Sequence, residues 1–322
     1  MADNKALSRA EVARRLAELQ GRVAVLMHAN PDGDTVSSSA ALCLALAALG
    51  KDAGYICADK IPERLEFIME GVKPIGELEG AAVISVDVAS RKQMGALADT
   101  VSPILMIDHH EVGEPFADNL IVGGMSSCAE VIYEILLELE KISGFKISLE
   151  IATALYAGIS SDTGSFRYSC TSPDTMRRAA ALIEMGVDFS AINHKLFFTK
   201  SPEEIKAEGI VASRLKTAFG GEVAYAEITL ADAAATGGME SFECAVDIAR
   251  SLRGVNIAFV VKEKAKGVYK ISLRSTGADV AFISKKFGGG GHTRAAGCTV
   301  EAECAEAVSR MILDALNNVI NK

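Results

Sequence analysis

The 322-residue chain contains no tryptophan, and only 6% of its residues are aromatic. Proteins that bind long single strands of nucleic acid stack successive bases on aromatic side chains, so the composition does not favour that class. The seven cysteines are odd in number and form no CxxC pair. They therefore indicate neither a disulfide framework nor a zinc framework, and they are typical of a reducing compartment. We expect a cytoplasmic protein.

Long hydrophobic runs are also missing. The most apolar stretch, Ala40–Leu49, has ten residues, whereas a membrane-spanning helix needs ~20. It follows an acidic segment, so we expect a buried helix there. The first residues contain no apolar signal core, and Ser8 and Glu11 have the spacing of a capping box at the start of an amphipathic helix. We therefore expect no association with a membrane.

The sequence has no excess of positive charge. Its formal net charge is −9, which argues against a protein that wraps long duplex nucleic acid. Residues 1–213 contain 30 acidic and 19 basic side chains, whereas residues 214–322 contain 12 acidic and 14 basic ones. Divalent ions bound in the acidic part would offset some of its charge. The pattern favours a small or short anionic substrate held between metal ions and a mildly basic second part.

Short apolar runs alternate with helical patterns from Val23 to about Met185. This alternation predicts an α/β fold with a mostly parallel sheet and helices on both faces. We expect a first unit over residues 1–188, a helical linker over 189–212, and a smaller α/β unit over 213–322, with the active-site cleft between the two units. The expected strands are Val23–Met27, Val83–Val86 and Ile104–Ile107 in the first unit, and Val223–Ile228, Ile257–Val261 and Tyr269–Leu273 in the second.

Acidic and histidine side chains follow the three expected strands of the first unit. Because the carboxyl ends of parallel strands meet at one edge of a sheet, we expect these side chains to converge in one crevice. Carboxylate and imidazole ligands without thiolate suit Mn²⁺ or Mg²⁺ better than a structural zinc. The pocket contains several carboxylates and no compensating Lys or Arg, so a single ion would leave it with excess negative charge. Two ions fit better. The expected metal ligands are His28, Asp32, Asp34, Asp87, His109 and Asp162.

Each of these residues also has a structural alternative. The acids of the His28–Asp34 stretch could cap the helix that starts near Thr35, and Asp87 could be another helix N-cap. Asp162 could be a turn residue at a helix C-terminus. However, four motifs occur in one order along the chain, and this joint occurrence favours the metal site over the separate explanations. The motifs are His28–Asp34, Asp87, the run Asp108-His109-His110, and Asp162.

The run Asp108-His109-His110 is more specific than the single acids. Adjacent histidines after a buried strand point to different sides, so one can bind a metal ion while the other faces the substrate. Asp108 can hold an imidazole by a hydrogen bond. We therefore assign catalytic roles to His110 and Asp108.

A second candidate site is the glycine-rich segment Gly288–His292. Consecutive glycines let backbone N–H groups approach phosphate or sugar oxygens, and His292 can add a hydrogen bond or stack on a base. Four glycines alone are more often a flexible loop, but several basic residues nearby favour a phosphate site, and an arginine on a strand can serve as a phosphate fork. The expected substrate-binding residues are Arg274, Gly288, Gly289, Gly290, Gly291 and His292.

Together the motifs resemble the DHH phosphoesterase family, and the segment Phe287–Gly297 resembles its associated C-terminal domain. The similarity extends over nearly the whole chain and is closest to the branch of short-RNA oligoribonucleases (nanoRNases) that also dephosphorylate 3′-phosphoadenosine 5′-phosphate. The resemblance implies that the first unit is catalytic, that the second binds substrate and that His110 contacts the scissile phosphate. It implies one metal ion on His28, Asp32 and Asp87 and a second on Asp34, His109 and Asp162, with Asp87 shared.

We therefore expect a phosphoesterase that uses two divalent ions, Mn²⁺ before Mg²⁺ or Co²⁺, to hydrolyse short single-stranded RNA or the adenosine bisphosphate. Hydrolysis of cyclic or linear dinucleotides such as c-di-AMP and pApA is the alternative. A nucleotide-sensing module is the non-enzymatic alternative, but it would have a broken ligand set. A related pyrophosphatase would lack the glycine-rich segment, and a RecJ-like exonuclease would carry extra domains. The preferred substrate, the direction of attack and the oligomeric state, including a homodimer, stay open.

Overall fold

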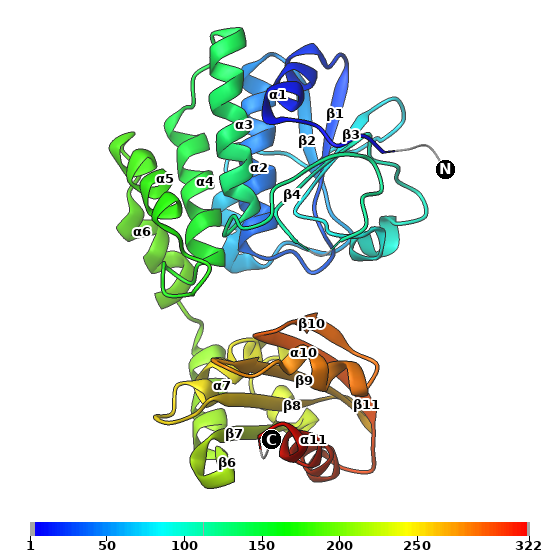
Figure 1. The fold of residues 1–322 in the computed structure, drawn as a ribbon, viewed down its shortest axis with the longest axis vertical. Coiled ribbons are helices and arrows are strands. Elements are labelled where there is room, and N and C mark those ends of the chain that lie inside the picture. The colour runs from blue at the N-terminus through cyan, green and yellow to red at the C-terminus, as the bar shows by residue number, and fades with distance from the viewer. Residues whose placement is uncertain (1–3, 112, 321–322) are drawn as a thin grey trace. The chain divides into compact units, whose positions relative to one another are not determined.

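A computed structural model describes residues 4–111 and 113–320, apart from the side chains of His292 and of residues 318–320 (Figure 1). The chain forms two compact units, Met1–Thr199 and Lys200–Lys322. Within the described ranges, no helix is both long and apolar enough to cross a membrane. The two units are described separately below, and the cleft expected between them stays a prediction.

The first unit is built on a parallel sheet that has five strands among the described residues, in the order β2-β1-β3-β4-β5. Its central strands are runs of aliphatic residues, because both faces of a parallel sheet are buried. The three predicted strands are present, and the prediction of a parallel α/β sheet is confirmed. The strands are β1 (Arg22–Leu26), β2 (Asp52–Ile56), β3 (Ala82–Val86), β4 (Leu105–Asp108) and β5 (Asp118–Ile121).

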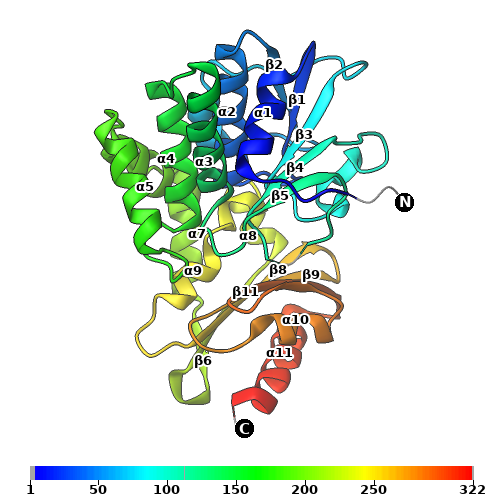
Figure 2. The same cartoon turned by 45° about the horizontal axis from the view of Figure 1, so that its top comes forward.

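Long helices cover one face of this sheet and form the largest core with it (Figure 2). They are α1 (Arg9–Glu18), α2 (Gly33–Ala48), α3 (Cys128–Ser143) and α4 (Leu149–Asp162). The predicted capping box is present at the start of α1. The opposite face carries a smaller core around Met94, which lies in the 3₁₀ helix η2 (Arg91–Leu97). A further 3₁₀ helix, η1 (Glu63–Met69), contacts α2.

Four helical elements follow α4 in the chain and lead into the second unit. The first unit ends with α5 (Pro173–Glu184), α6 (Phe189–Asn193) and the π-helical turn η3 (His194–Phe198), and the second begins with α7 (Pro202–Ser213). The segment 189–212 is therefore largely helical, and the boundary between the units falls within it. The division into three parts at residues 188 and 212 stays a prediction.

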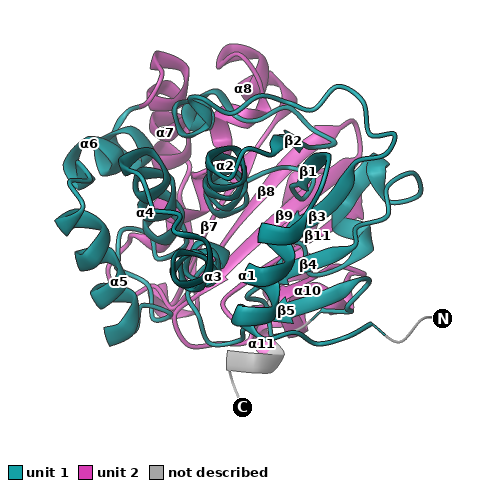
Figure 3. Ribbon diagram, turned by 90° about the horizontal axis from the view of Figure 1, so that it is seen from above, with its two compact units in different colours: residues 1–199 teal, residues 200–322 magenta. Residues whose placement is uncertain are grey.

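The second unit, magenta in Figure 3, is built on a mixed sheet in the order β10-β11-β9-β8-β7-β6. The helices α10 and α11 pack against one face, and α7 and α9 pack against β7 and β8 on the other. The expected smaller α/β unit is confirmed. Its elements are β6 (Lys216–Ala218), η4 (Phe219–Gly221), β7 (Val223–Ile228), α8 (Leu230–Ala235), η5 (Met239–Phe242), α9 (Ala245–Arg250), β8 (Ile257–Ala265), β9 (Val268–Ser275), α10 (Val280–Lys286), β10 (Gly290–His292), β11 (Ala295–Glu301) and α11 (Ala305–Ile320).

Candidate metal centre

Acidic and histidine side chains from separate segments of the first unit converge at the carboxyl edge of its parallel sheet. Within each of three groups, the potential ligand atoms lie within 4.8 Å of one another. All six expected metal ligands belong to these groups, as do Asp108 and His110. The groups are His28, Asp32 and Asp87; Asp34, His109 and Asp162; and Asp87, Asp108, His109 and His110.

Asp87 lies at the centre of this arrangement, directly after β3. Its backbone has φ 59°, a left-handed conformation that costs a non-glycine residue about 1–3 kcal/mol and that tends to occur at functional sites. Its N–H still donates to the Ile107 carbonyl at 3.0 Å, so neighbouring strand β4 holds the turn in place. The side chain is buried. The backbone strain is thus a sign of function that does not depend on the side chain's chemistry.

The amino terminus of α2 supplies two further acids. Asp32 is the N-cap of this helix and accepts the N–H groups of Asp34 and Thr35, so the capping alternative is correct for Asp32. The Asp34 carboxylate is fully buried and accepts the N–H groups of Cys128 at 2.5 Å and Ala129 at 3.0 Å, at the start of α3. Capping does not remove Asp32 from the cluster, because its Oδ1 also lies 3.5 Å from His28 Nε2.

His28 and His109, the two histidines among the expected metal ligands, direct the same ring nitrogen towards Asp87. His28 Nδ1 lies 2.8 Å from the Ala29 carbonyl, and His109 Nδ1 lies 3.1 Å from the Met125 carbonyl. Because a carbonyl only accepts, each Nδ1 carries the proton and each Nε2 faces the carboxylates. The Nε2 atom of His28 lies 3.7 Å from Asp87 Oδ2, and that of His109 lies 3.5 Å from Asp87 Oδ1. A proton or a metal ion is needed in each gap, and Asp87 presents one oxygen to each.

The electrostatics of the cluster favour a bound cation. Burial raises the pKa of Asp87 well above its usual range, and the charges of Asp34, Asp32 and Asp162 raise it further. Burial and the neighbouring acids raise the pKa of Asp162 in the same way. Among the described residues, the buried Asp87 Oδ1 has no hydrogen-bond partner, and such a group is costly unless it is satisfied. The donor set therefore fits divalent cations.

Asp108 and His110 form a hydrogen-bonded pair within the third group, and His110 Nδ1 also lies 3.6 Å from Asp87 Oδ1. Asp108 Oδ1 accepts the His109 N–H and the His110 ring Nδ1–H, both at 2.8 Å. Burial alone would lower the pKa of His110, but the hydrogen bond to Asp108 raises it above the usual value. The imidazole that Asp108 holds is therefore that of His110, whereas His109 is held by the Met125 carbonyl. The sequence contains no signal for that carbonyl, because any residue type can supply it.

In the second unit, three of the expected substrate-binding residues, Gly290, His292 and Arg274, lie in two cross-strand rows of the sheet. Gly291 lies between these rows, and Gly288 and Gly289 precede β10. Gly290, Gly297 and Ser272 are paired in one row, and Ala295 and Arg274 are paired in the next. Paired residues of antiparallel strands point to the same face, so small residues form a flat area beside the Arg274 position. We call the surface formed by these two rows, which contain Gly290, Gly297, Ser272, Ala295 and Arg274, the glycine row. The side chain of His292 lies outside the described part of the structure.

The glycines of this segment differ in what the fold requires of them. A Cβ on Gly289 would meet the Gly297 carbonyl at 2.3 Å, and Gly288 and Gly291 have positive φ. These three are therefore required by packing or by backbone conformation. In contrast, Gly290 has no positive φ, and nothing lies within 4 Å of the position of its Cβ. Neither packing nor backbone conformation therefore requires a glycine at position 290.

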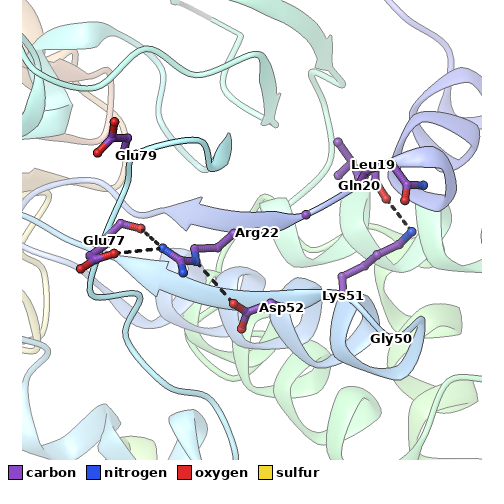
Figure 4. Close-up of a pocket in the computed structure, with 9 residues that line it drawn as sticks. Leu19, Gln20, Arg22, Gly50, Lys51, Asp52, Glu77 and Glu79 are labelled. Atoms are coloured by element: carbon purple, nitrogen blue, oxygen red, sulfur yellow. Dashed lines mark hydrogen bonds and ion pairs between the residues drawn. The ribbon is translucent and has the colours of Figure 1, made fainter.

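Another hollow lies at the opposite edge of the first unit's sheet, and its basic side chains are paired with a carboxylate or with backbone carbonyls (Figure 4). There Arg22 contacts Asp52 at 3.4 Å and the Glu77 carbonyl at 3.0 Å, and Lys51 donates to the Ala17 and Leu19 carbonyls. These cations are engaged in holding the ends of strands and helices. We therefore assign this hollow no part in the candidate site.

Models of two protein families match the chain. The DHH family N-terminal domain matches residues 22–159, and the DHHA1 domain matches residues 220–322. The family resemblance inferred from the Asp-His-His run and from the glycine-rich segment is therefore confirmed.

Similar proteins cover nearly the same length. A protein of Thermus thermophilus named bifunctional oligoribonuclease and PAP phosphatase NrnA is 31% identical over 97% of this chain and 94% of its own. The Bacillus subtilis protein of the same name is 27% identical over 89% of this chain and 91% of its own. Among solved structures, an exopolyphosphatase-related protein from Bacteroides fragilis aligns with a TM-score of 0.87 and 23% identity, covering 99% of this chain and 98% of that one. This structural likeness shows the fold.

Proposed function

The chain belongs to the DHH family, and from this premise we propose that it is a cytoplasmic phosphoesterase that hydrolyses short RNA oligonucleotides and 3′-phosphoadenosine 5′-phosphate. The observation that carries the proposal is the complete cluster of acids and histidines around Asp87. The substrates follow from relatives over nearly the whole chain that are named oligoribonuclease and PAP phosphatase. A nucleotide-sensing module without activity would not need a complete ligand set.

The cluster would hold two divalent ions. His28, Asp32 and Asp87 would bind one, and Asp34, His109 and Asp162 the other, with Asp87 shared through its two oxygens. Bound ions of this kind lower the pKa of water and neutralise charge on a phosphoryl group. Mixed carboxylate and imidazole ligands favour Mn²⁺ over Mg²⁺.

The protein's own groups have separate tasks in this reaction. The Asp108 carboxylate orients the His110 ring and favours its protonated form, in which His110 can donate a hydrogen bond to a phosphoryl oxygen or a proton to the leaving oxygen. In the second unit, the glycine row would bring backbone N–H groups and the Arg274 guanidinium to the rest of the nucleotide.

Substrate length is the first test of this function. The large acidic excess of residues 1–213 repels the trailing phosphates of a long strand, and the small basic excess of residues 214–322 attracts phosphates only within ~8–10 Å. We expect kcat/KM to be highest for RNA of ~2–5 nucleotides, an estimate from that reach, and to fall for longer strands. The measurement is the rate on single strands of increasing length at fixed salt, together with the adenosine bisphosphate and pApA. A kcat/KM that keeps rising beyond about ten nucleotides would favour a processive exonuclease instead.

The two adjacent histidines should respond differently to alanine. His109→Ala should remove about one Mn²⁺ per chain together with activity, because its Nε2 faces the cluster. His110→Ala should keep both ions and lower kcat by ~10²–10⁴-fold, the usual contribution of a general acid. Metal content and kcat of both variants decide this, with His194→Ala, an exposed histidine of η3, as the control. Equal metal loss in the two variants would reverse the assigned roles.

Gly290→Val tests the glycine row. A Cβ at this position meets no atom within 4 Å, so we expect the protein to fold normally. It should nevertheless lower kcat/KM for dinucleotides by at least ~10-fold, or about 1.4 kcal/mol, and should affect a small generic phosphodiester much less. Gly76→Val, at a position that is equally open in the first unit, is the matched control. Equal damage to both substrates would mean that Gly290 is structural.

A further inference from the structure

One short segment, residues 125–129, holds two expected ligands of the same metal ion. The Met125 carbonyl accepts from His109, and the N–H groups of Cys128 and Ala129 donate to Asp34. The ligands of the other ion are held elsewhere: His28 contacts the Ala29 carbonyl, and Asp32 caps α2. A displacement of segment 125–129 would therefore affect one metal site and not the other.

A buried network ties this segment to α5. Ser126 Oγ donates to Glu130 Oε1 at 2.5 Å, and Arg178 Nη1 donates to Glu130 Oε2 at 2.9 Å. Arg178 Nε also donates to Glu134 at 2.7 Å. The Glu130 side chain is 1% exposed and that of Arg178 is 16% exposed. Charge-assisted bonds in such a setting fix geometry strongly, and a buried carboxylate without its cation is costly.

The place of Glu130 makes it a link between α5 and the metal ligands. It lies in the first turn of α3, where Ser127 caps the helix by accepting the Glu130 N–H. Through its carboxylate it holds Ser126, the neighbour of Met125, and Ser126 also accepts a long hydrogen bond from Thr175 of α5. Arg178 is therefore linked to segment 125–129 through Glu130 and Ser126 without belonging to any of the three ligand groups.

We propose that Arg178 is a positioning residue for the metal site formed by Asp34, His109 and Asp162, acting through Glu130 and Ser126. The proposal rests on the two-ion centre of the proposed function and extends it to a residue of a helix that supplies no ligand. Partners that orient metal ligands typically change metal affinity by ~10–100-fold when they are removed. Loss of this network should weaken one metal site selectively.

The main test is Mn²⁺ titration of the full-length, metal-free protein by calorimetry. The double variant Arg178→Met/Glu130→Gln removes both charges together and so avoids leaving a buried ion unpaired. We expect it to raise the Kd of one Mn²⁺ by ~10-fold or more and to leave the other Kd unchanged. Arg177→Ala is the matched control, because this adjacent arginine is 74% exposed and pairs with Asp174 in its own helix. It should change neither Kd.

Further variants assign the affected site. His109→Ala alone should abolish the same binding event that the double variant weakens, and His28→Ala should abolish the other. Adding His109→Ala to the double variant should cause much less than the additive loss, because both changes act on one site. Arg178→Lys should restore only part of the affinity, since an ammonium cannot reproduce the fork between Glu130 and Glu134.

Ser126→Ala decides the question if the double variant is unfolded by circular dichroism, because it keeps the ion pair and cuts only the link to segment 125–129. It should weaken the same site. Two unchanged Kd values, or equal weakening of both sites, in a folded variant would overturn the proposal. A wild-type protein that binds fewer than two ions would instead overturn the proposed function on which it rests.

Discussion

Replacing Asp87 by asparagine is expected to lower the rate of phosphoester hydrolysis by more than ~10³-fold, beyond the loss of a single preorganised group. The reason is that Asp87 presents one oxygen to His28 and the other to His109, so the change weakens both metal sites at once. The measurements are kcat and the number of Mn²⁺ ions bound per chain. Asp99→Asn, an exposed position in the same unit, is the control and should match the wild type. An Asp87→Asn variant that binds two ions and turns over normally would contradict the account.

The same substitution should not destabilise the metal-free protein. Burial and the neighbouring carboxylates raise the folded-state pKa of Asp87 above its unfolded value. Its ionised form therefore destabilises the fold at pH values above the folded-state pKa, and this penalty disappears as the pH falls below the unfolded-state pKa. In excess chelator, Asp87→Asn should have a higher Tm than the wild type at neutral pH and a similar Tm in acid. A lower Tm at neutral pH would show that Asp87 is a structural residue.

Removal of metal ions should abolish turnover in the wild type. In excess chelator we expect activity to fall by at least ~10³-fold, equal to about 4 kcal/mol of lost transition-state stabilisation, because the charge-neutralising ions are gone. Added Mn²⁺ should restore the rate, and Mg²⁺ should restore less of it. Circular dichroism of the metal-free protein controls for unfolding. Full activity in excess chelator would rule out a metal-dependent mechanism.

The sequence predicts the central part of the fold better than its edges. Strands β1, β3 and β4 are continuous aliphatic runs, and each is followed by acids or histidines, so both the parallel sheet and its functional edge were predictable. The edge strand β2 contains Gly54 and begins with Asp52, and β10 is mostly glycine, so neither has a strand pattern. Pairing with β1 in the first sheet makes β2 a strand, and pairing with β11 in the second sheet makes β10 a strand.

In the candidate site too, the sequence predicts some features and not others. The six expected ligands come together because each follows a strand or ends a helix at the same sheet edge, which is a local signal. The φ of Asp87 and the Met125 carbonyl that holds His109 are backbone features that no residue pattern encodes. The ion pair between Glu130 and Arg178 joins residues 48 positions apart, so its existence depends on the tertiary arrangement of α3 and α5.

The most direct test of the two-ion account is anomalous diffraction from crystals of the full-length protein grown with Mn²⁺. The account predicts two strong peaks, one beside His28 and Asp32 and one beside Asp34, His109 and Asp162, with Asp87 contacting both ions. A single peak, or two peaks that do not share Asp87, would contradict it.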